Sequence, residues 1–190
     1  MDNEDFAFKR CGMAHRERFE IMKKLFLEVL RETKRKGAVL EIGVHNGGSS
    51  LLWMTLMGKS NNLRHMITID PYILYPTLYC ETIMYLSRNA VDIGLQWMHY
   101  SVPDTMFFDS VFSILPEDQK KYAFCYLDGP HDHESVVREV EFFRDKMVPK
   151  GVMLIDDISL HSPTGKAAKQ LCADFEIGKL PNQIWLRRKR

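Results

Sequence analysis

Residues 38–50 read AVLEIGVHNGGSS, and this stretch decides the fold of the chain. Residues 38–42 are short and apolar enough for a buried strand, and the apolar residues from Ser49 to Met57 predict a packed helix. Glycines at positions 43, 47 and 48 fill the turn between them, where backbone can approach a ligand closely. The turn has neither the G-x-G-x-x-G spacing of dinucleotide-binding folds nor the lysine of a P-loop, so both of those sites are disfavoured.

Strands and helices alternate on both sides of this turn. Apolar residues at helical spacing predict a first helix over 16–36, which Gly37 ends. Four more strands are expected, at 66–69, 96–100, 123–127 and 152–155. Further helices are expected at 79–93, along the face formed by Val136, Val140, Phe143 and Met147, and at 165–173.

The order of these elements predicts an α/β fold of Rossmann-like type. Right-handed crossovers give a mainly parallel sheet with helices on both faces, and ligands bind at the carboxyl ends of its strands. Two short segments, 175–180 and 183–187, are joined across Pro181-Asn182 and predict a closing antiparallel hairpin.

Composition places the chain among ordinary globular proteins. Its 190 residues are 45% hydrophobic, enough to build one core, so a single domain over 1–190 is expected. The formal net charge of +1 gives no general attraction to nucleic acid or an anionic membrane. No apolar run approaches the roughly 18 residues of a membrane span, and residues 1–10 do not resemble a signal peptide. Four widely spaced cysteines are interpreted as reduced thiols, and a cytoplasmic location is expected.

Acidic residues follow three of the expected strands. Asp70 ends the second strand, where it can accept hydrogen bonds from both hydroxyls of a ribose. Asp128 ends the fourth strand, and Asp156 and Asp157 end the fifth. Three carboxylates at one sheet edge repel one another unless they are protonated or neutralised, and a hard divalent cation neutralises them directly. Mg²⁺ is the first candidate, with Mn²⁺ or Ca²⁺ as alternatives; the bland interpretation is an Asp pair that caps a helix or braces a loop.

The glycine turn and the acid of the second strand together resemble the cofactor site of class I S-adenosylmethionine-dependent methyltransferases, over about residues 39–158. The resemblance implies a cofactor site made of Glu41, Gly43, His45, Gly47, Asp70, Tyr72, Ser101 and Asp128. It implies that Gly43, His45 and Gly47 line the methionine part, that Asp70 holds the ribose and that Glu41 contributes indirectly.

The resemblance also assigns the adenine end of the cofactor. Ser101, just after the third strand, matches a position that contacts the adenine in many such O-methyltransferases, and Tyr72 is expected to stack near it. The cofactor half of the domain is expected to span about 38–101, and the metal and acceptor half about 123–162.

The second half resembles the metal-dependent O-methyltransferases, both the catechol type and the macrolide-sugar type. The resemblance implies that Asp128, Asp156 and Asp157 bind the metal, and that His131, three residues beyond Asp128, is the catalytic base. The corresponding residue is a lysine in the catechol type and a histidine in the sugar type. The implied mechanism has the metal lower the pKa of a substrate hydroxyl and His131 accept its proton, after which the oxygen attacks the sulfonium methyl.

Three functional hypotheses follow. The first is O-methylation of a small acceptor with vicinal hydroxyls, as in a catechol or a sugar. The second is an RNA methyltransferase, suggested by Lys34-Arg35-Lys36 and the basic residues 187–190. The third is a cofactor-binding protein without methyl transfer, or a relative whose family name suggests oxidation. The chain has little room for a substrate domain, so short loops, the N-terminal segment or a neighbouring subunit of a homo-oligomer would recognise the acceptor.

Overall fold

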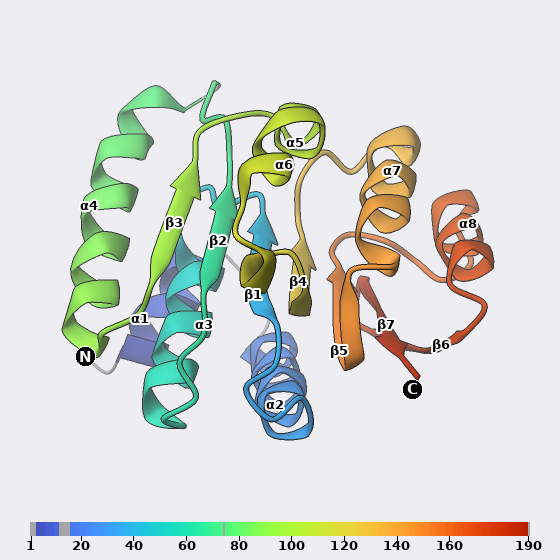
Figure 1. The fold of residues 1–190 in the computed structure, drawn as a ribbon, viewed down its shortest axis with the longest axis horizontal. Helices are drawn as coiled ribbons and strands as arrows, with labels where there is room; N and C mark the ends of the chain where they lie inside the picture. The colour runs from blue at the N-terminus through green and yellow to red at the C-terminus, as the bar shows by residue number, and fades with distance from the viewer. Residues whose placement is uncertain (1–2, 12–15, 74, 190) are drawn as a thin grey trace.

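The computed structural model describes residues 3–11, 16–73 and 75–189, and it confirms the predicted α/β fold with a seven-stranded sheet (Figure 1). The strands are β1 (Ala38–Ile42), β2 (Met66–Ile69), β3 (Trp97–Tyr100), β4 (Tyr122–Leu127), β5 (Met147–Ile155), β6 (Phe175–Leu180) and β7 (Gln183–Arg188). Their order across the sheet is β3-β2-β1-β4-β5-β7-β6; the first five are parallel, and β7 is antiparallel to both β5 and β6. The strand order reverses between β1 and β4, the switch point at which such sheets bind ligands.

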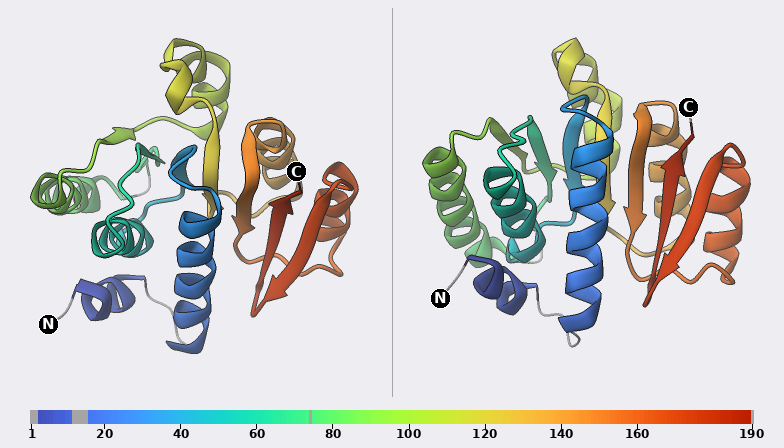
Figure 2. Two further views of the ribbon diagram at one scale, coloured as in Figure 1. Left: turned by 60° about the horizontal axis from the view of Figure 1, so that its bottom comes forward. Right: turned by 90° about the horizontal axis from the view of Figure 1, so that it is seen from below.

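Helices cover both faces of the sheet (Figures 1 and 2). One face packs against α1 (Asn3–Arg10), α2 (Arg16–Glu32), α3 (Gly48–Lys59) and α4 (Pro76–Ile93). The other face packs against α5 (Asp104–Met106), the π-helix η1 (Phe107–Val111), α6 (Phe112–Ile114), α7 (His133–Arg144) and α8 (Pro163–Leu171). A 3₁₀ turn, η2 (Glu117–Gln119), leads into β4.

Alternation along the strands builds the two cores. On β4, Phe124 packs edge-on against Phe26 of α2 and Trp53 of α3, while its neighbours Cys125 and Leu127 point to the opposite core. These strand residues are fully or almost fully buried, as expected for a parallel sheet covered on both faces.

The register of the strands fixes where the site forms. Ile42 pairs with Ile69 on one side and with Leu127 on the other, and Leu127 in turn pairs with Ile155. The residues that follow these positions therefore emerge at one edge of the sheet.

The structure corrects some of the expected boundaries. Met147 is the first residue of β5 and does not belong to α7, which ends at Arg144; the strand thus begins earlier than residue 152. The apolar spacing misled because Met147 faces the same core as the helix, and burial alone does not distinguish the two states. The first helix ends at Glu32 rather than Lys36, since Lys34 and Arg35 have left-handed φ values of 48° and 64°.

Two helical segments had no counterpart in the sequence interpretation. The α5–η1–α6 segment lies near the carboxyl ends of the strands in Figure 1, and its pieces are too short to show a periodic apolar face. Helix α1 packs on α3, and the Arg10 Nε atom donates a hydrogen bond of 2.6 Å to the Asn46 carbonyl in the glycine turn. Within the described residues, we find no helix that is both long and apolar enough to cross a membrane.

Because Gly43 has no side chain, its backbone can lie close to the backbone of Asp128. Its φ is +84°, and an added Cβ would overlap the carbonyl oxygen of Asp128. Gly94 has a similar φ of +68° but open space within 4 Å, so Gly94→Ala is the matched control.

We expect Gly94→Ala to cost about 1–2 kcal/mol, the price of a left-handed alanine alone. Gly43→Ala should lower the free energy of unfolding by clearly more, as measured by urea denaturation. If both variants lose the same free energy of unfolding, the backbone at Gly43 can move away from Asp128 at no extra cost.

Candidate functional site

Two cavities adjoin at the carboxyl ends of the strands and share Gly43, His45 and Asp128. The smaller, about 250 Å³, is mostly polar and is also bounded by Cys11, Arg18, Asn46, Ser49, Asp156 and Asp157. The larger, about 660 Å³, is mostly apolar and is also bounded by Ile69, Asp70, Tyr72, Ile73, Tyr75, Pro103, Pro130 and His131. The site therefore offers a polar compartment next to an apolar one.

The glycine turn separates these compartments. His45 is left-handed, with φ 48°, and so is Gly47, with φ 76°, at the N-cap of α3. Gly43 and His45 line both cavities, whereas Gly47 lines neither and packs under Thr82 and Leu86 of α4. Gly47 is thus required by the turn itself, and its contact with a cofactor stays a prediction.

Asp70 holds the turn closed. Its Oδ2 atom accepts hydrogen bonds of 2.9 Å from the N–H groups of both Val44 and His45, and its Oδ1 atom accepts one of 2.8 Å from Tyr72. A carboxylate can accept about four hydrogen bonds, so these three leave little further capacity. Asp70 also borders the apolar cavity, where that remaining capacity can serve one hydroxyl of a ligand rather than two.

Glu41 lies inside the fold, outside both cavities. Its two carboxylate oxygens accept hydrogen bonds from the hydroxyls of Ser49 and Ser50, which ties β1 to the first turn of α3. Burial raises the pKa of Glu41 to about 7, against the two serine hydrogen bonds, which lower it. Glu41 therefore has no direct access to either cavity, and its predicted indirect contribution to the cofactor site stays a prediction.

A cluster of packed aromatic rings lies beside Asp70. Tyr72 is buried, and its ring packs edge-on against Tyr79 and His99, at centroid distances of 5.2 and 5.7 Å. Burial lowers the pKa of His99 to about 4, so the ring is neutral near pH 7. His99 Nε2 lies 3.1 Å from the Oγ atom of Ser101, which is exposed and borders neither cavity. Sequence reasoning missed His99, because a histidine within a strand carries no distinguishing pattern.

The predicted acid cluster comes together at the ends of β4 and β5. His131 Nε2 lies 3.7 Å from Asp128 Oδ1 and 3.9 Å from Asp157 Oδ2. Burial, reinforced by the like charge of Asp156, raises the pKa of Asp128 to about 9. Burial, together with the neighbouring acids, thus makes this carboxyl hard to ionise.

The negative charge of Asp156 is compensated by other side chains of the protein. Its Oδ1 atom accepts a hydrogen bond from the Arg18 guanidinium, and its Oδ2 atom accepts one from the Tyr126 hydroxyl. Neither partner was identified from the sequence. Arg18 is one of several charged residues at the start of a helix, and Tyr126 is part of an apolar strand, so nothing in the local sequence distinguishes them. Contacts between elements so far apart in the chain leave no local pattern.

The chemistry of the donors fits a hard divalent cation, because carboxylate oxygens are its preferred ligands. In their present positions, however, no three His, Cys, Asp or Glu side chains of the described residues are arranged to hold a metal ion. Arg18 already donates a hydrogen bond to Asp156. Asp128 and Asp157 face His131 and have no such guanidinium bond at hydrogen-bonding distance among the described residues.

The chain is similar to methyltransferases. A family model described as a methyltransferase domain matches residues 40–158. Uncharacterized protein R132 of Acanthamoeba polyphaga mimivirus is 23% identical over 159 residues, which cover 80% of this chain and 68% of that protein.

Solved structures of methyltransferases share the fold. Podospora anserina methyltransferase PaMTH1, bound to SAH, has a TM-score of 0.62 at 14% identity, covering 99% of this chain and 86% of that one. CalS11, a TDP-rhamnose 3'-O-methyltransferase, has a TM-score of 0.65 at 17% identity, covering 87% and 79%. The O-methyltransferase NovP has a TM-score of 0.63 at 17% identity, covering 88% and 80%.

The raised pKa of Glu41 gives a testable pH dependence. The folded chain binds this proton more tightly than the unfolded chain, so stability falls as the pH rises from about 4.5 to about 7. A shift of this size corresponds to about 3 kcal/mol. Glu41→Gln, which cannot ionise, should lose less stability than the wild type between pH 5 and pH 7.5 in urea titrations. Parallel pH profiles for the two proteins would place the ionisation elsewhere.

Proposed function

The chain belongs to the methyltransferase domain family, and from that premise we propose that it transfers the methyl group of S-adenosylmethionine to a hydroxyl oxygen of a small acceptor. The observation that carries this proposal is the pair of adjoining cavities of opposite polarity. The cofactor has the same division, with a zwitterionic amino-acid end and a larger, flatter adenosine end. One chain thus supplies a matching compartment for each end.

We assign the amino-acid end to the polar cavity and the adenosine to the apolar one. Asp70 would accept a hydrogen bond from a ribose hydroxyl, and Tyr72 would pack beside the base. Ser101, held by His99, remains a proposed adenine contact that requires the cofactor to reach beyond the present cavity. The sulfonium would then lie at the junction, beside Gly43 and Asp128.

His131 is the proposed base. Its side chain is 43% exposed and borders the apolar cavity, so an acceptor hydroxyl can reach it. His131 would take the proton from this hydroxyl as the oxygen forms its bond to the methyl carbon and the carbon–sulfur bond breaks. The products are the methyl ether, S-adenosylhomocysteine and a protonated His131. The flanking Asp157 carboxylate, 3.9 Å from Nε2, would stabilise the imidazolium, while correct alignment supplies much of the rate.

The proposal also includes a bound divalent cation. Asp128, Asp156 and Asp157 would hold Mg²⁺, with Mn²⁺ or Ca²⁺ as alternatives. When bound, the cation would lower the pKa of the acceptor hydroxyl.

The apolar cavity of about 660 Å³ would hold both the adenosine, beside Asp70 and Tyr72, and the acceptor, beside His131, and its lining favours an uncharged aromatic diol, such as a catechol, as the acceptor. Ile73, Tyr75 and Pro130 line the same cavity as His131, and the described residues that line it include no lysine or arginine. A nucleotide-linked sugar, as named for CalS11, would bring a pyrophosphate into this uncompensated space. The same argument disfavours RNA. A cytoplasmic location and a homo-oligomer remain predictions from the sequence.

Calorimetric titration of S-adenosylmethionine, with Mg²⁺ and separately with EDTA, tests the proposal. We expect binding in both conditions, followed by formation of a methylated product when a catechol and Mg²⁺ are added. Binding without turnover of catechols, sugars or RNA would support the alternative of a non-catalytic cofactor-binding protein. Absence of binding in both conditions would contradict the proposed activity.

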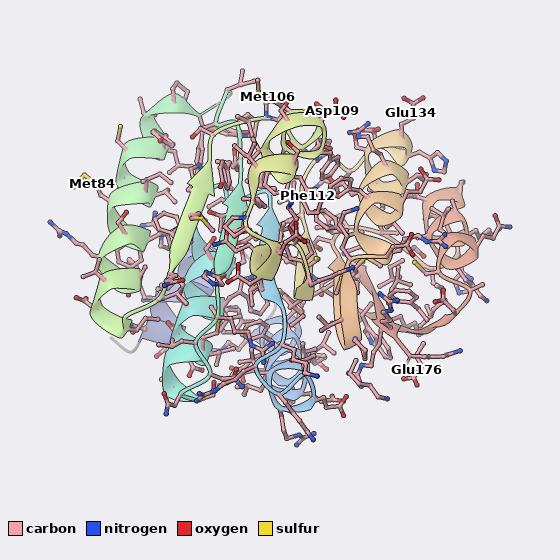
Figure 3. All side chains as sticks on the ribbon, viewed as in Figure 1. Met84, Met106, Asp109, Phe112, Glu134 and Glu176 are labelled. Atoms are coloured by element: carbon pink, nitrogen blue, oxygen red, sulfur yellow. The ribbon has the colours of Figure 1, made fainter. Side chains whose placement is uncertain are left out.

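Asp70→Asn tests the cofactor assignment. The amide keeps the shape of the side chain but replaces a charged acceptor, so affinity for S-adenosylhomocysteine should fall about tenfold or more in calorimetry. Asp109→Asn is the control, because Asp109 is exposed on η1 and is labelled at the outer surface in Figure 3. If both variants bind as the wild type does, Asp70 only closes the turn.

His131→Gln tests the base. Loss of a general base should lower kcat by about a hundredfold or more, with little change in affinity for S-adenosylhomocysteine. His133→Gln is the matched control, since the His133 ring lies 3.1 Å from Thr164 Oγ1 and outside both cavities. An unchanged kcat for His131→Gln across neutral pH would remove this residue as the base.

A further inference from the structure

Arg18 lies at the boundary between the N-terminal helices and the acid cluster. One end of its guanidinium donates to Asp156 Oδ1, and its Nη1 atom lies 3.9 Å from Asp157 Oδ1. Only 16% of the side chain is exposed, and its buried Nε atom has no hydrogen-bond partner. The guanidinium is thus bound through one edge only.

Asp156 has little capacity left for another partner. Its Oδ1 atom accepts from Arg18 and, at 2.7 Å, from the N–H group of Asp157; its Oδ2 atom accepts from Tyr126. Tyr126 is a fully buried residue of β4, and the Asp157 bond is part of the backbone turn, so neither can readily leave. Arg18 is the partner that can move.

We propose that Arg18 is an internal cation that competes with the divalent cation for Asp156, so that the metal is bound only when the guanidinium releases this carboxylate. The inference rests on the proposed function, from which the metal site is taken. Two positive charges on one carboxylate repel each other, so the bound guanidinium weakens metal binding and a bound metal weakens the guanidinium contact. In the metal-free state the guanidinium limits the repulsion between Asp156 and Asp157.

The neighbouring space allows this exchange. Arg18 itself borders the polar cavity of about 250 Å³, so in the chain without cofactor its long side chain can turn away from Asp156 while α2 stays in place. Arg18 also lies in the first turn of that helix, where the flanking Arg16 is exposed and paired with Asp5 at 2.9 Å and Glu20 at 3.2 Å. Arg16 provides a matched positive charge that does not touch the cluster.

Mn²⁺ binding in the absence of acceptor, measured by calorimetry and by the electron paramagnetic resonance of free Mn²⁺, tests the proposal. Arg18→Gln should tighten Mn²⁺ binding on the order of tenfold. Arg16→Gln removes the same charge from the same helical turn and should leave the affinity unchanged. Arg18→Met, of similar length, is the second variant, and circular dichroism checks that each protein is folded.

A double-mutant cycle with Asp156→Asn separates competition from a general charge effect. If Arg18 acts through Asp156, Arg18→Gln should no longer tighten Mn²⁺ binding in the Asp156→Asn background. The proposal is overturned if the gain persists there, if Arg18→Gln binds no more tightly than the wild type, or if none of these proteins binds Mn²⁺. Failure of the proposed function itself would show separately, as a wild-type chain that does not bind S-adenosylhomocysteine.

Discussion

The hydrogen bonds from the N–H groups of Val44 and His45 to Asp70 are the interaction on which the site depends. They close a turn in which Gly43, His45 and Gly47 are left-handed, a conformation that costs free energy at His45 because, unlike the two glycines, it carries a side chain. Glu41 fixes the other side of the turn through the serines of α3. Because Gly43 and His45 border both cavities, a change in this turn would alter the polar and apolar compartments together.

Buried acids in this protein are compensated in different ways. Glu41 is held by two hydroxyls, and Asp156 by a guanidinium and a phenol. Asp128 has no guanidinium partner among the described residues; the Tyr126 phenol lowers its pKa, but burial next to other acids outweighs this effect and leaves the pKa raised to about 9. The cluster thus combines one carboxylate that is already neutralised with others that are open to a new partner, as a binding site for a cation or a polar acceptor requires.

The sequence predicts the fold well where the rules are local or topological. The ends of β1, β2, β4 and β5 follow from apolar runs stopped by glycine or aspartate, and parallel pairing then brings Asp70, Asp128 and Asp156 to one edge. The contributions of Arg18 and His99 depend on how distant elements pack, which no spacing in the chain expresses. Gly47 shows a further limit of the sequence, since a glycine needed for a turn has the same sequence signature as one that contacts a cofactor.

Strand β7 has a consequence for how the protein is made. It lies between β5 and β6 in the sheet, and its Ile184 and Leu186 are fully buried, although residues 183–188 are synthesised after every other strand. Until they emerge from the ribosome, the apolar run Val152-Met153-Leu154-Ile155 of β5 presents an unpaired edge, the kind of surface on which chains aggregate. The five parallel strands can therefore pair before β7 is made, and the free edge of β5 stays open to other chains until residues 183–188 cover it.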